Sequence, residues 1–249
     1  MANLDPRYAR GAVSTADTMD AGLRAYMLRV YNYMLVGLGL TGLVAWVTAN
    51  TPLLNLLYNQ VQTANGTSLQ PSILGWVAFL SPLAVTFFLS FRVQQMSFAA
   101  VQGTFWLLAG LMGLQLSAIL LVYTGASIAM TFFVTAGMFG GMSLYGYTTR
   151  RDLTGFGSFL IMGVWGLMLA MLVGVFFHSS ALQLTISVLG VFIFTGLTAY
   201  DSQRIKNMYY VGDSGEIVGK KAVMGALSLY LDFYNMFLFL LRFMGNQRR

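Results

Sequence analysis

Seven long apolar stretches constrain this sequence more than any other feature. Each approaches or exceeds the roughly 20 residues that an α-helix needs to cross about 30 Å of hydrocarbon. Their apolar residues are continuous rather than alternating, which favours helices over the strands of a membrane β-barrel. The seven stretches are Val30–Ala49, Ile73–Phe91, Phe98–Tyr123, Ile128–Tyr147, Phe156–Phe177, Ala181–Tyr200 and Ala222–Phe243. The sequence therefore predicts an all-α membrane protein with about seven transmembrane helices.

The charge content supports the same conclusion. Only 9% of the 249 residues are charged, whereas roughly 25% are charged in an ordinary soluble protein. The net charge of +6 comes from basic residues at the edges of the apolar stretches, so a membrane surface explains them better than a nucleic acid does. Cysteine is absent and His178 is the single histidine, which excludes disulfides and a multi-histidine metal centre within one chain. We expect no cofactor.

The connections between the stretches predict the domain organisation and the orientation. Residues 1–27 are expected to form a cytoplasmic tail, residues 28–245 a single transmembrane domain, and residues 246–249 a basic C-terminal tail. Every second connection is basic, and the positive-inside rule therefore places the N-terminus in the cytoplasm. The basic residues of these connections are Arg7, Arg10, Arg24, Arg29, Arg92, Arg150, Arg151, Arg204, Lys206, Lys220 and Lys221.

Two features of this layout leave alternatives open. Arg242, Arg248 and Arg249 would lie outside if the last stretch spans, so that stretch either crosses fully, which its length favours, or re-enters. Gly137 and Gly141 form a G-x-x-x-G pattern, which favours close packing inside the monomer over a dimer interface.

Two carboxylates are the residues most indicative of chemistry. Asp201 ends the sixth stretch and Asp232 lies near the middle of the seventh. A charged side chain at the bilayer centre costs roughly 2.5–3.5 kcal/mol, so such a residue faces the protein interior. Ser228 and Asn235 stand at i−4 and i+3 from Asp232 and extend a polar stripe on one helix face. Lipid does not accept this stripe, so we predict that the last helix is central and wrapped by the other six.

The pair predicts a site that responds to protons or cations. Two nearby carboxylates cannot both ionise cheaply in a low dielectric, so a proton would be shared between them. Oxygen ligands also suit calcium, and a proton and Ca²⁺ would then compete for Asp201 and Asp232. Arg92 is a candidate latch to Asp201, and an ordinary positive-inside anchor is the alternative. A purely structural alternative for Asp232 is a neutral acid bonded to Ser228 or to a helix backbone.

Enzymatic motifs are missing from the sequence. It has no Walker loop, no G-x-S-x-G and no H-E-x-x-H. An intramembrane aspartyl protease also uses two aspartates, and Tyr200-Asp201 fits half of its pattern, but Leu231-Asp232 lacks the glycines of the other half. We therefore predict a protein that is not an enzyme.

The C-terminal part of the chain resembles the transmembrane Bax inhibitor motif family, in its bacterial branch. The resemblance rests on FTGLTAYDSQRI at residues 194–205 and ALSLYLDFYNMFL at residues 226–238. It implies a seven-helix fold with a central last helix and a two-aspartate pH sensor at Asp201 and Asp232, with Arg92 as a weaker match for the latch. Family members are associated with calcium leak, and some bacterial relatives with modulation of a membrane-bound protease.

The leading hypothesis from the sequence is therefore a pH-sensitive, calcium-permeable channel or leak protein of the bacterial inner membrane. Its partners would be the lipid bilayer, calcium ions and protons. The alternative is a non-enzymatic regulator that binds a membrane protease or another membrane protein through its N-terminal tail and lipid-facing helices.

Overall fold

The computed structural model describes residues 6–63, 66–177 and 179–248, including their side chains except those of residues 6–19 and 60–69. His178, Arg249 and the side chains of Arg7 and Arg10 lie outside the described residues. The elements in chain order are α1 (Pro6–Ala49), α2 (Leu53–Leu57), β1 (Tyr58–Thr63), β2 (Gly66–Pro71), α3 (Ile73–Arg92), the 3₁₀-helix η1 (Val93–Gln95), α4 (Phe98–Val122), α5 (Gly125–Thr148), α6 (Thr154–Phe176), α7 (Ser180–Asn207) and α8 (Gly215–Met244).

The prediction of seven spanning helices is confirmed. Within the described part of the chain, seven helices are long and apolar enough to cross a membrane, namely α1 from Asp20 onward, α3 and α4 to α8. Helices α3, α4, α5, α7 and α8 each follow a Ser or Thr whose hydroxyl accepts a hydrogen bond from the first turn. Such caps satisfy backbone N–H groups that a helix start leaves unpaired.

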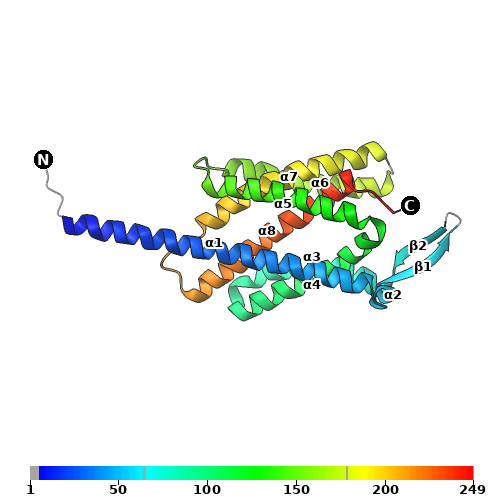
Figure 1. Cartoon of the computed structure of the whole chain (residues 1–249), viewed down its shortest axis with the longest axis horizontal. Coiled ribbons are helices and arrows are strands. Elements are labelled where there is room, and N and C mark those ends of the chain that lie inside the picture. The colour runs from blue at the N-terminus through cyan, green and yellow to red at the C-terminus, as the bar shows by residue number, and fades with distance from the viewer. Residues whose placement is uncertain (1–5, 64–65, 178, 249) are drawn as a thin grey trace.

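Helix α8 is the central element, as the polar stripe predicted. In its most apolar segment 72% of the residues are buried, against 39% or less in every other spanning helix. Figure 1 shows α8 crossing the middle of the molecule, with α1, α3 and α4 on one side and α5, α6 and α7 on the other. Its main contacts are with α1, α4, α5 and α7, while α3 packs on α4 and α6 packs on α7. Four helices therefore enclose α8 directly, and α3 and α6 form an outer layer.

The two groups of three helices repeat one packing pattern. The third helix of each group, α4 or α7, packs against the other two helices of its group and against α8. The first helix, α1 or α5, also contacts α8, and the second, α3 or α6, stays outside. Two crossings, α3 and α4, lie between α1 and α5, so α1 and α5 cross the membrane in opposite directions, and so do the two groups.

Helix α1 differs from the predicted tail. It begins at Pro6, a residue that suits the first position of a helix, and no proline interrupts it before Pro52. Tyr26 and Met27 are 2% and 3% exposed. The transmembrane unit therefore begins before residue 28, and part of the predicted tail continues the first spanning helix.

Residues 50–72, which carry no charge, contain secondary structure. They form the short helix α2 and an antiparallel hairpin in which Tyr58 pairs with Pro71 and Thr63 with Gly66. The signal in the sequence was Asn65-Gly66, a dipeptide that favours hairpin turns.

Helix α3 continues through Pro82, which cannot donate a hydrogen bond to the carbonyl of Ala78. The Ser81 hydroxyl donates to that carbonyl over 3.2 Å. The side chain thus replaces the missing backbone bond, as a helix in lipid requires.

The C-terminus shows that α8 crosses fully. The Arg248 amide donates to the Val122 carbonyl over 2.8 Å, and the Thr124 amide donates to the Asn246 carbonyl over 3.1 Å. The Asn246 amide also donates to the Ser127 hydroxyl over 2.9 Å. These bonds tie the end of the chain to the α4–α5 connection. This connection lies at the opposite end of the molecule from the start of α1 (Figure 1). Helix α8 therefore does not return to the side on which it starts, which excludes the re-entrant alternative.

The expectation that Gly137 and Gly141 pack inside the monomer is wrong. A methyl group added at either position would meet no atom within 4 Å. The glycine of α5 that does permit close packing is Gly146, where an added methyl group would overlap the carbonyl oxygen of Ala199 in α7.

This contrast predicts opposite effects of two alanine substitutions. Gly146→Ala should destabilise the protein by about 1–3 kcal/mol, because overpacking forces α5 and α7 apart. Gly141→Ala, on the same helix but in open space, should be neutral or slightly stabilising. Unfolding in mixed micelles measures both, and equal stabilities would contradict the close α5–α7 approach.

The orientation is testable because the natural sequence contains no cysteine. We expect Gln247→Cys to react with a membrane-impermeant thiol reagent on intact spheroplasts, and Arg151→Cys to react only after permeabilisation. Both residues are exposed, so labelling reports sidedness. The reverse pattern would place the N-terminus outside.

Candidate functional site

The carboxyl pair lies where α7 packs against the central helix. Asp232 is 4% exposed and Asp201 is 9% exposed. The two helices come close one to two helical turns from the acids, where Gly225 of α8 lies opposite Ile205 of α7 and an added methyl carbon would be 2.9 Å from Ile205 Cγ2. A side chain at residue 225 would therefore separate the two helices that carry the acids.

The carboxyl groups of Asp201 and Asp232 lie close enough to interact directly. A carboxylate only accepts hydrogen bonds, so a hydrogen bond between the two groups would need one proton on the pair. Asp232 Oδ2 is buried, and no N–H or hydroxyl group of the described residues donates a hydrogen bond to it. The structure thus brings the two predicted acids together in a place with few hydrogen-bond donors.

Arg204 is a cation beside the pair. Its Nη1 lies 3.5 Å from Asp201 Oδ1, and its side chain is 52% exposed whereas that of Asp201 is 13% exposed. Asp201 therefore stands between a solvent-accessible cation and the buried acid. The i,i+3 spacing of Asp201 and Arg204 on one helix could have indicated this pair from the sequence.

Arg92, the predicted latch, is not brought to the pair in this structure. It is exposed at the end of α3, and its Nη1 donates to Gln95 Oε1 over 2.7 Å. Because α3 belongs to the outer layer around α4, Arg92 contacts neither Asp201 nor Asp232 within the described structure. A latching role for Arg92 stays a prediction.

Ser228 and Asn235 flank the pair rather than lining it. Both are half-buried, and Asn235 Nδ2 donates to the Leu231 carbonyl of its own helix over 2.8 Å. At 3.6 residues per turn, positions i−4 and i+3 are both rotated by about 40–60° to the same side of residue i. The predicted stripe therefore runs from the buried Asp232 toward a less buried edge of α8.

A chain of hydroxyl groups that the sequence did not predict reaches α7 beside Asp201. The Tyr31 hydroxyl is 2.6 Å from Ser143 Oγ, which is 2.8 Å from Ser202 Oγ. Ser143 and Ser202 are 3% and 0% exposed. These hydrogen bonds join α1, α5 and α7, so the residue next to Asp201 is connected to two further helices.

A second polar contact fixes α8 two residues before Asp232. The Tyr230 hydroxyl is 2.7 Å from Thr41 Oγ1 in α1, and that oxygen is 2.9 Å from the Ala109 carbonyl in α4. Tyr230 is fully buried and its ring meets that of Phe105 edge to face at 5.9 Å. The central helix is therefore held on the side away from α7.

The start of α8 is tied to the end of α7. Lys221 Nζ donates to the Met208 carbonyl over 2.9 Å and to Asp213 Oδ2 over 2.5 Å. Both partners belong to the segment that joins the two helices, so the two helix ends next to the carboxyl pair are held together.

The pair alone offers few ligands to a cation. Ca²⁺ takes six to eight oxygen ligands in protein sites, and the described residues contain no group of three or more acidic, histidine or cysteine side chains placed to hold a metal. Binding of calcium by Asp201 and Asp232 stays a prediction.

Comparison with known proteins decides the family. Residues 23–249 match the family model for "Inhibitor of apoptosis-promoting Bax1". The chain belongs to the Bax inhibitor family. It is 47% identical over 232 residues to protein RP147 of Rickettsia prowazekii, with 93% of each chain covered. It is 46% identical to the inner membrane protein YbhL of Escherichia coli, over 92% of this chain and 94% of that protein.

The family match confirms the resemblance seen in the C-terminal segments and extends it over the whole transmembrane unit. It begins at residue 23, close to the point at which the side chains of α1 become buried. Asp201, Asp232, Arg204 and the hydroxyl chain all lie within the matched range. This Bax inhibitor family member is thus a multi-pass membrane protein.

The hydroxyl chain predicts a measurable coupling between α1 and α5. Tyr31→Phe and Ser143→Ala should each destabilise the protein by about 1 kcal/mol. The loss of stability in the double mutant should be roughly 0.6 kcal/mol smaller than the sum of the losses in the two single mutants. The exposed pair Tyr145→Phe and Ser158→Ala is the matched control and should be additive. Additivity of both pairs would show that the Tyr31–Ser143 bond does not connect the helices.

Proposed function

We propose that this protein is a pH-sensitive calcium leak pathway of the bacterial inner membrane, controlled by protonation of Asp201 and Asp232. The observation that carries the proposal is the proximity of two buried carboxyl groups on adjacent, closely packed helices. One of those helices is the central element of the fold. A change of charge on Asp201 or Asp232 therefore acts on α8, which contacts α1, α4, α5 and α7.

The number of protons on the pair determines the force between α7 and α8. With one proton, the pair carries one negative charge beside Arg204, and the carboxyl groups can attract each other through a hydrogen bond. Without a proton, two carboxylates repel each other in a poorly hydrated interior, where such repulsion is strong. Loss of the proton therefore favours a conformation in which the acids are farther apart.

The neighbouring contacts transmit such a movement. Ser202 follows Asp201 directly and bonds to Ser143 of α5, which bonds to Tyr31 of α1. A displacement of α7 strains both bonds, so α1 and α5 respond to the state of the pair. Coupling of this kind requires a bistable contact that both partners bias, and we assign that role to the α7–α8 interface.

Calcium enters the proposal as the transported ion. Carboxylate oxygens are suitable ligands for it, and no N–H or hydroxyl group of the described residues donates to Asp232 Oδ2. Proton and calcium thus compete for the same oxygens, which makes the leak depend on pH.

The test is calcium flux into liposomes that contain the purified full chain, at about pH 6 and about pH 8, on either side of neutrality. Wild-type flux should differ between the two conditions, because the ionised fraction of one group changes up to about tenfold per pH unit. In Asp232→Asn and Asp201→Asn the ratio of the two fluxes should fall to about one, since an amide keeps the size but cannot titrate.

Asp152→Asn is the matched control. Asp152 is exposed, and its Oδ1 accepts hydrogen bonds from the amide and hydroxyl of Thr154, which the amide oxygen of Asn can also do. This variant should keep the wild-type pH dependence. Flux that is absent in the wild type, or unchanged in Asp232→Asn, would disprove the proposed function.

We also propose that the N-terminus is cytoplasmic, which the basic connections Arg150–Arg151 and Lys220–Lys221 support. Binding of a membrane protease stays a prediction from the sequence.

A further inference from the structure

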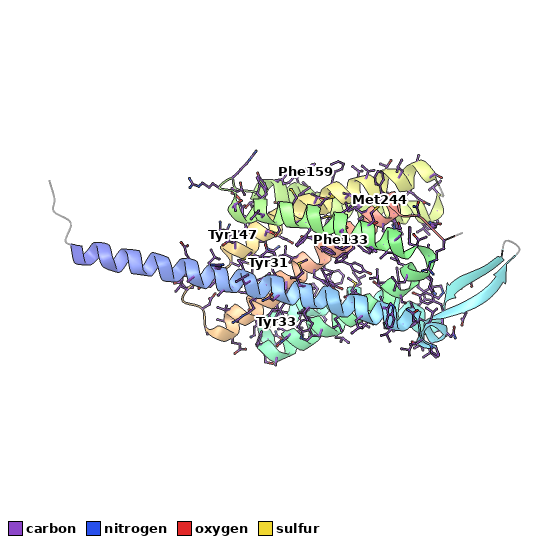
Figure 2. The ribbon with its side chains drawn as sticks, viewed as in Figure 1. Tyr31, Tyr33, Phe133, Tyr147, Phe159 and Met244 are labelled. Atoms are coloured by element: carbon purple, nitrogen blue, oxygen red, sulfur yellow. The ribbon has the colours of Figure 1, made fainter. Side chains whose placement is uncertain are left out.

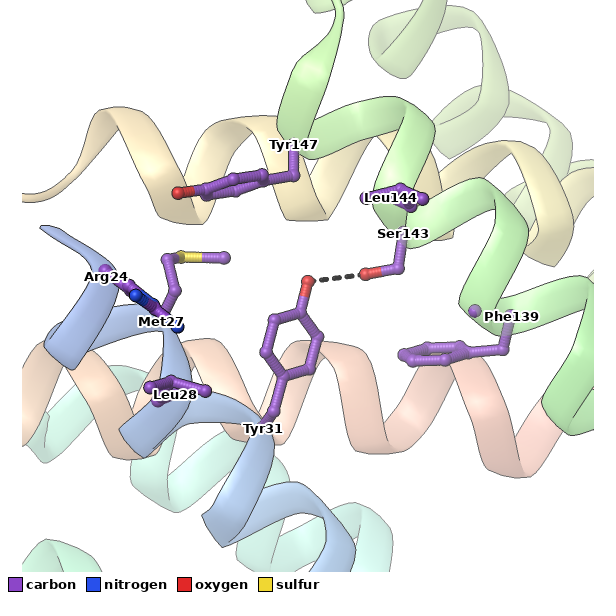
Figure 3. Close-up of a pocket in the computed structure, with 9 residues that line it drawn as sticks. Arg24, Met27, Leu28, Tyr31, Phe139, Ser143, Leu144 and Tyr147 are labelled. Atoms are coloured by element: carbon purple, nitrogen blue, oxygen red, sulfur yellow. Dashed lines mark hydrogen bonds between the residues drawn. The ribbon is translucent and has the colours of Figure 1, made fainter. Parts of the chain in front are cut away.

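A lateral groove opens between α1 and α5. It is a cavity of about 420 Å³ lined by residues of these two helices alone, and volumes of this size are typical of ligand sites. Figure 3 shows Arg24 and Tyr147 at one end of the groove and Phe139 at the other, with Tyr31 and Ser143 between them. In Figure 2, Tyr31 and Tyr147 lie in the half of the molecule nearer the start of α1, away from Met244.

A hydrogen bond joins the two walls of the groove. It links Tyr31 of α1 to Ser143 of α5 over 2.6 Å and so limits how far the two helices can separate. Gly140 lines the wall formed by α5, and a methyl group added there would meet no atom within 4 Å. The absence of a side chain at residue 140 thus keeps the groove open, and no rearrangement is needed to fill it.

The groove opens toward the lipid. Leu28 and Leu144 stand at its rims and are 53% and 63% exposed. Both belong to spanning helices, so their exposed surfaces contact acyl chains and not water. An apolar groove with such rims is continuous with the hydrocarbon around the protein.

One end of the groove carries positive charge. Arg24 lies four residues after the start of the first span, which is the depth of lipid headgroups. Lys206 stands near the same end, with Nζ 5.3 Å from the centre of the Tyr147 ring and 2.8 Å from the Tyr147 carbonyl that it bonds. The remaining lining is apolar apart from the hydroxyls of Tyr31, Ser143 and Tyr147.

We propose that this groove binds one anionic phospholipid of the leaflet that faces the start of α1. One acyl chain lies along Leu28, Gly140 and Leu144 toward Phe139, and the headgroup phosphate contacts Arg24. Charge at one end and apolar surface along the rest match a lipid better than a protein helix, which would need apolar contacts over its full length. The inference does not depend on calcium transport.

The experiment titrates the detergent-purified full chain with phosphatidylglycerol and with phosphatidylcholine of identical acyl chains, and counts bound lipids by native mass spectrometry. Wild type should retain one phosphatidylglycerol in preference to phosphatidylcholine. Arg24→Gln should weaken phosphatidylglycerol binding about fivefold and leave phosphatidylcholine unchanged, as expected for one cation at the membrane surface. Arg29→Gln, on the same helix but outside the groove, should have no effect.

A side chain that fills the groove tests whether an acyl chain binds there. Gly140→Leu should abolish retention of the bound lipid, because its side chain enters the groove. Gly141→Leu is the matched control, since residue 141 also has open space but does not line the groove, and it should bind as wild type. If Gly140→Leu fails to fold, the effect of Arg24→Gln alone decides whether the groove binds an anionic phospholipid.

Three outcomes would overturn the proposal. They are equal retention of the two lipids by wild type, equal effects of Arg24→Gln and Arg29→Gln, and full retention by a folded Gly140→Leu. A dimer that Gly140→Leu disrupts and lipid does not affect would also overturn it and would assign the groove to a second copy of the chain.

Discussion

The burial of a carboxyl group in the last helix is the constraint on which the rest of the structure depends. Asp232 cannot face lipid without a large free-energy cost, so α8 must be enclosed by other helices. The fold meets this requirement with α1, α4, α5 and α7 around α8, and with Asp201 placed beside Asp232. A polar residue at one position thus decides which helix is central.

The enclosing helices are held by a few polar bonds at well-defined levels. Hydrocarbon offers no hydrophobic drive for one helix to leave lipid for another, so close packing and interhelical hydrogen bonds carry the specificity. Gly146 and Gly225 permit close contact of α7 with α5 and with α8. Tyr31, Ser143 and Ser202 then add the directional bonds. The contacts of Gly146, Ser143 and Gly225 reach α7 within four residues of Asp201, so packing and the candidate site are parts of one arrangement.

Much of this could be predicted from the sequence, because length and apolarity alone specify a spanning helix. The centrality of α8 followed from Asp232, and the proximity of Asp201 followed from the same reasoning. What could not be predicted depends on helix rotation and on non-local contacts. The prediction for Gly137 and Gly141 was wrong because a spacing of three or four residues defines a helix face but not its direction. The same spacing did not show that the stripe of Ser228 and Asn235 runs toward a less buried edge. The Tyr31–Ser143–Ser202 chain joins residues far apart in sequence, and no local pattern indicates it.

Hydrogen bonds at three levels limit how α8 can move. Its C-terminal end is tied to the α4–α5 connection by backbone bonds, and its N-terminal end is held to the end of α7 through Lys221. Between them, the Tyr230–Thr41 bond holds α8 to α1 two residues before Asp232. Under the proposed function, repulsion between Asp201 and Asp232 would therefore twist α8 between these fixed points and would not displace the helix as a whole.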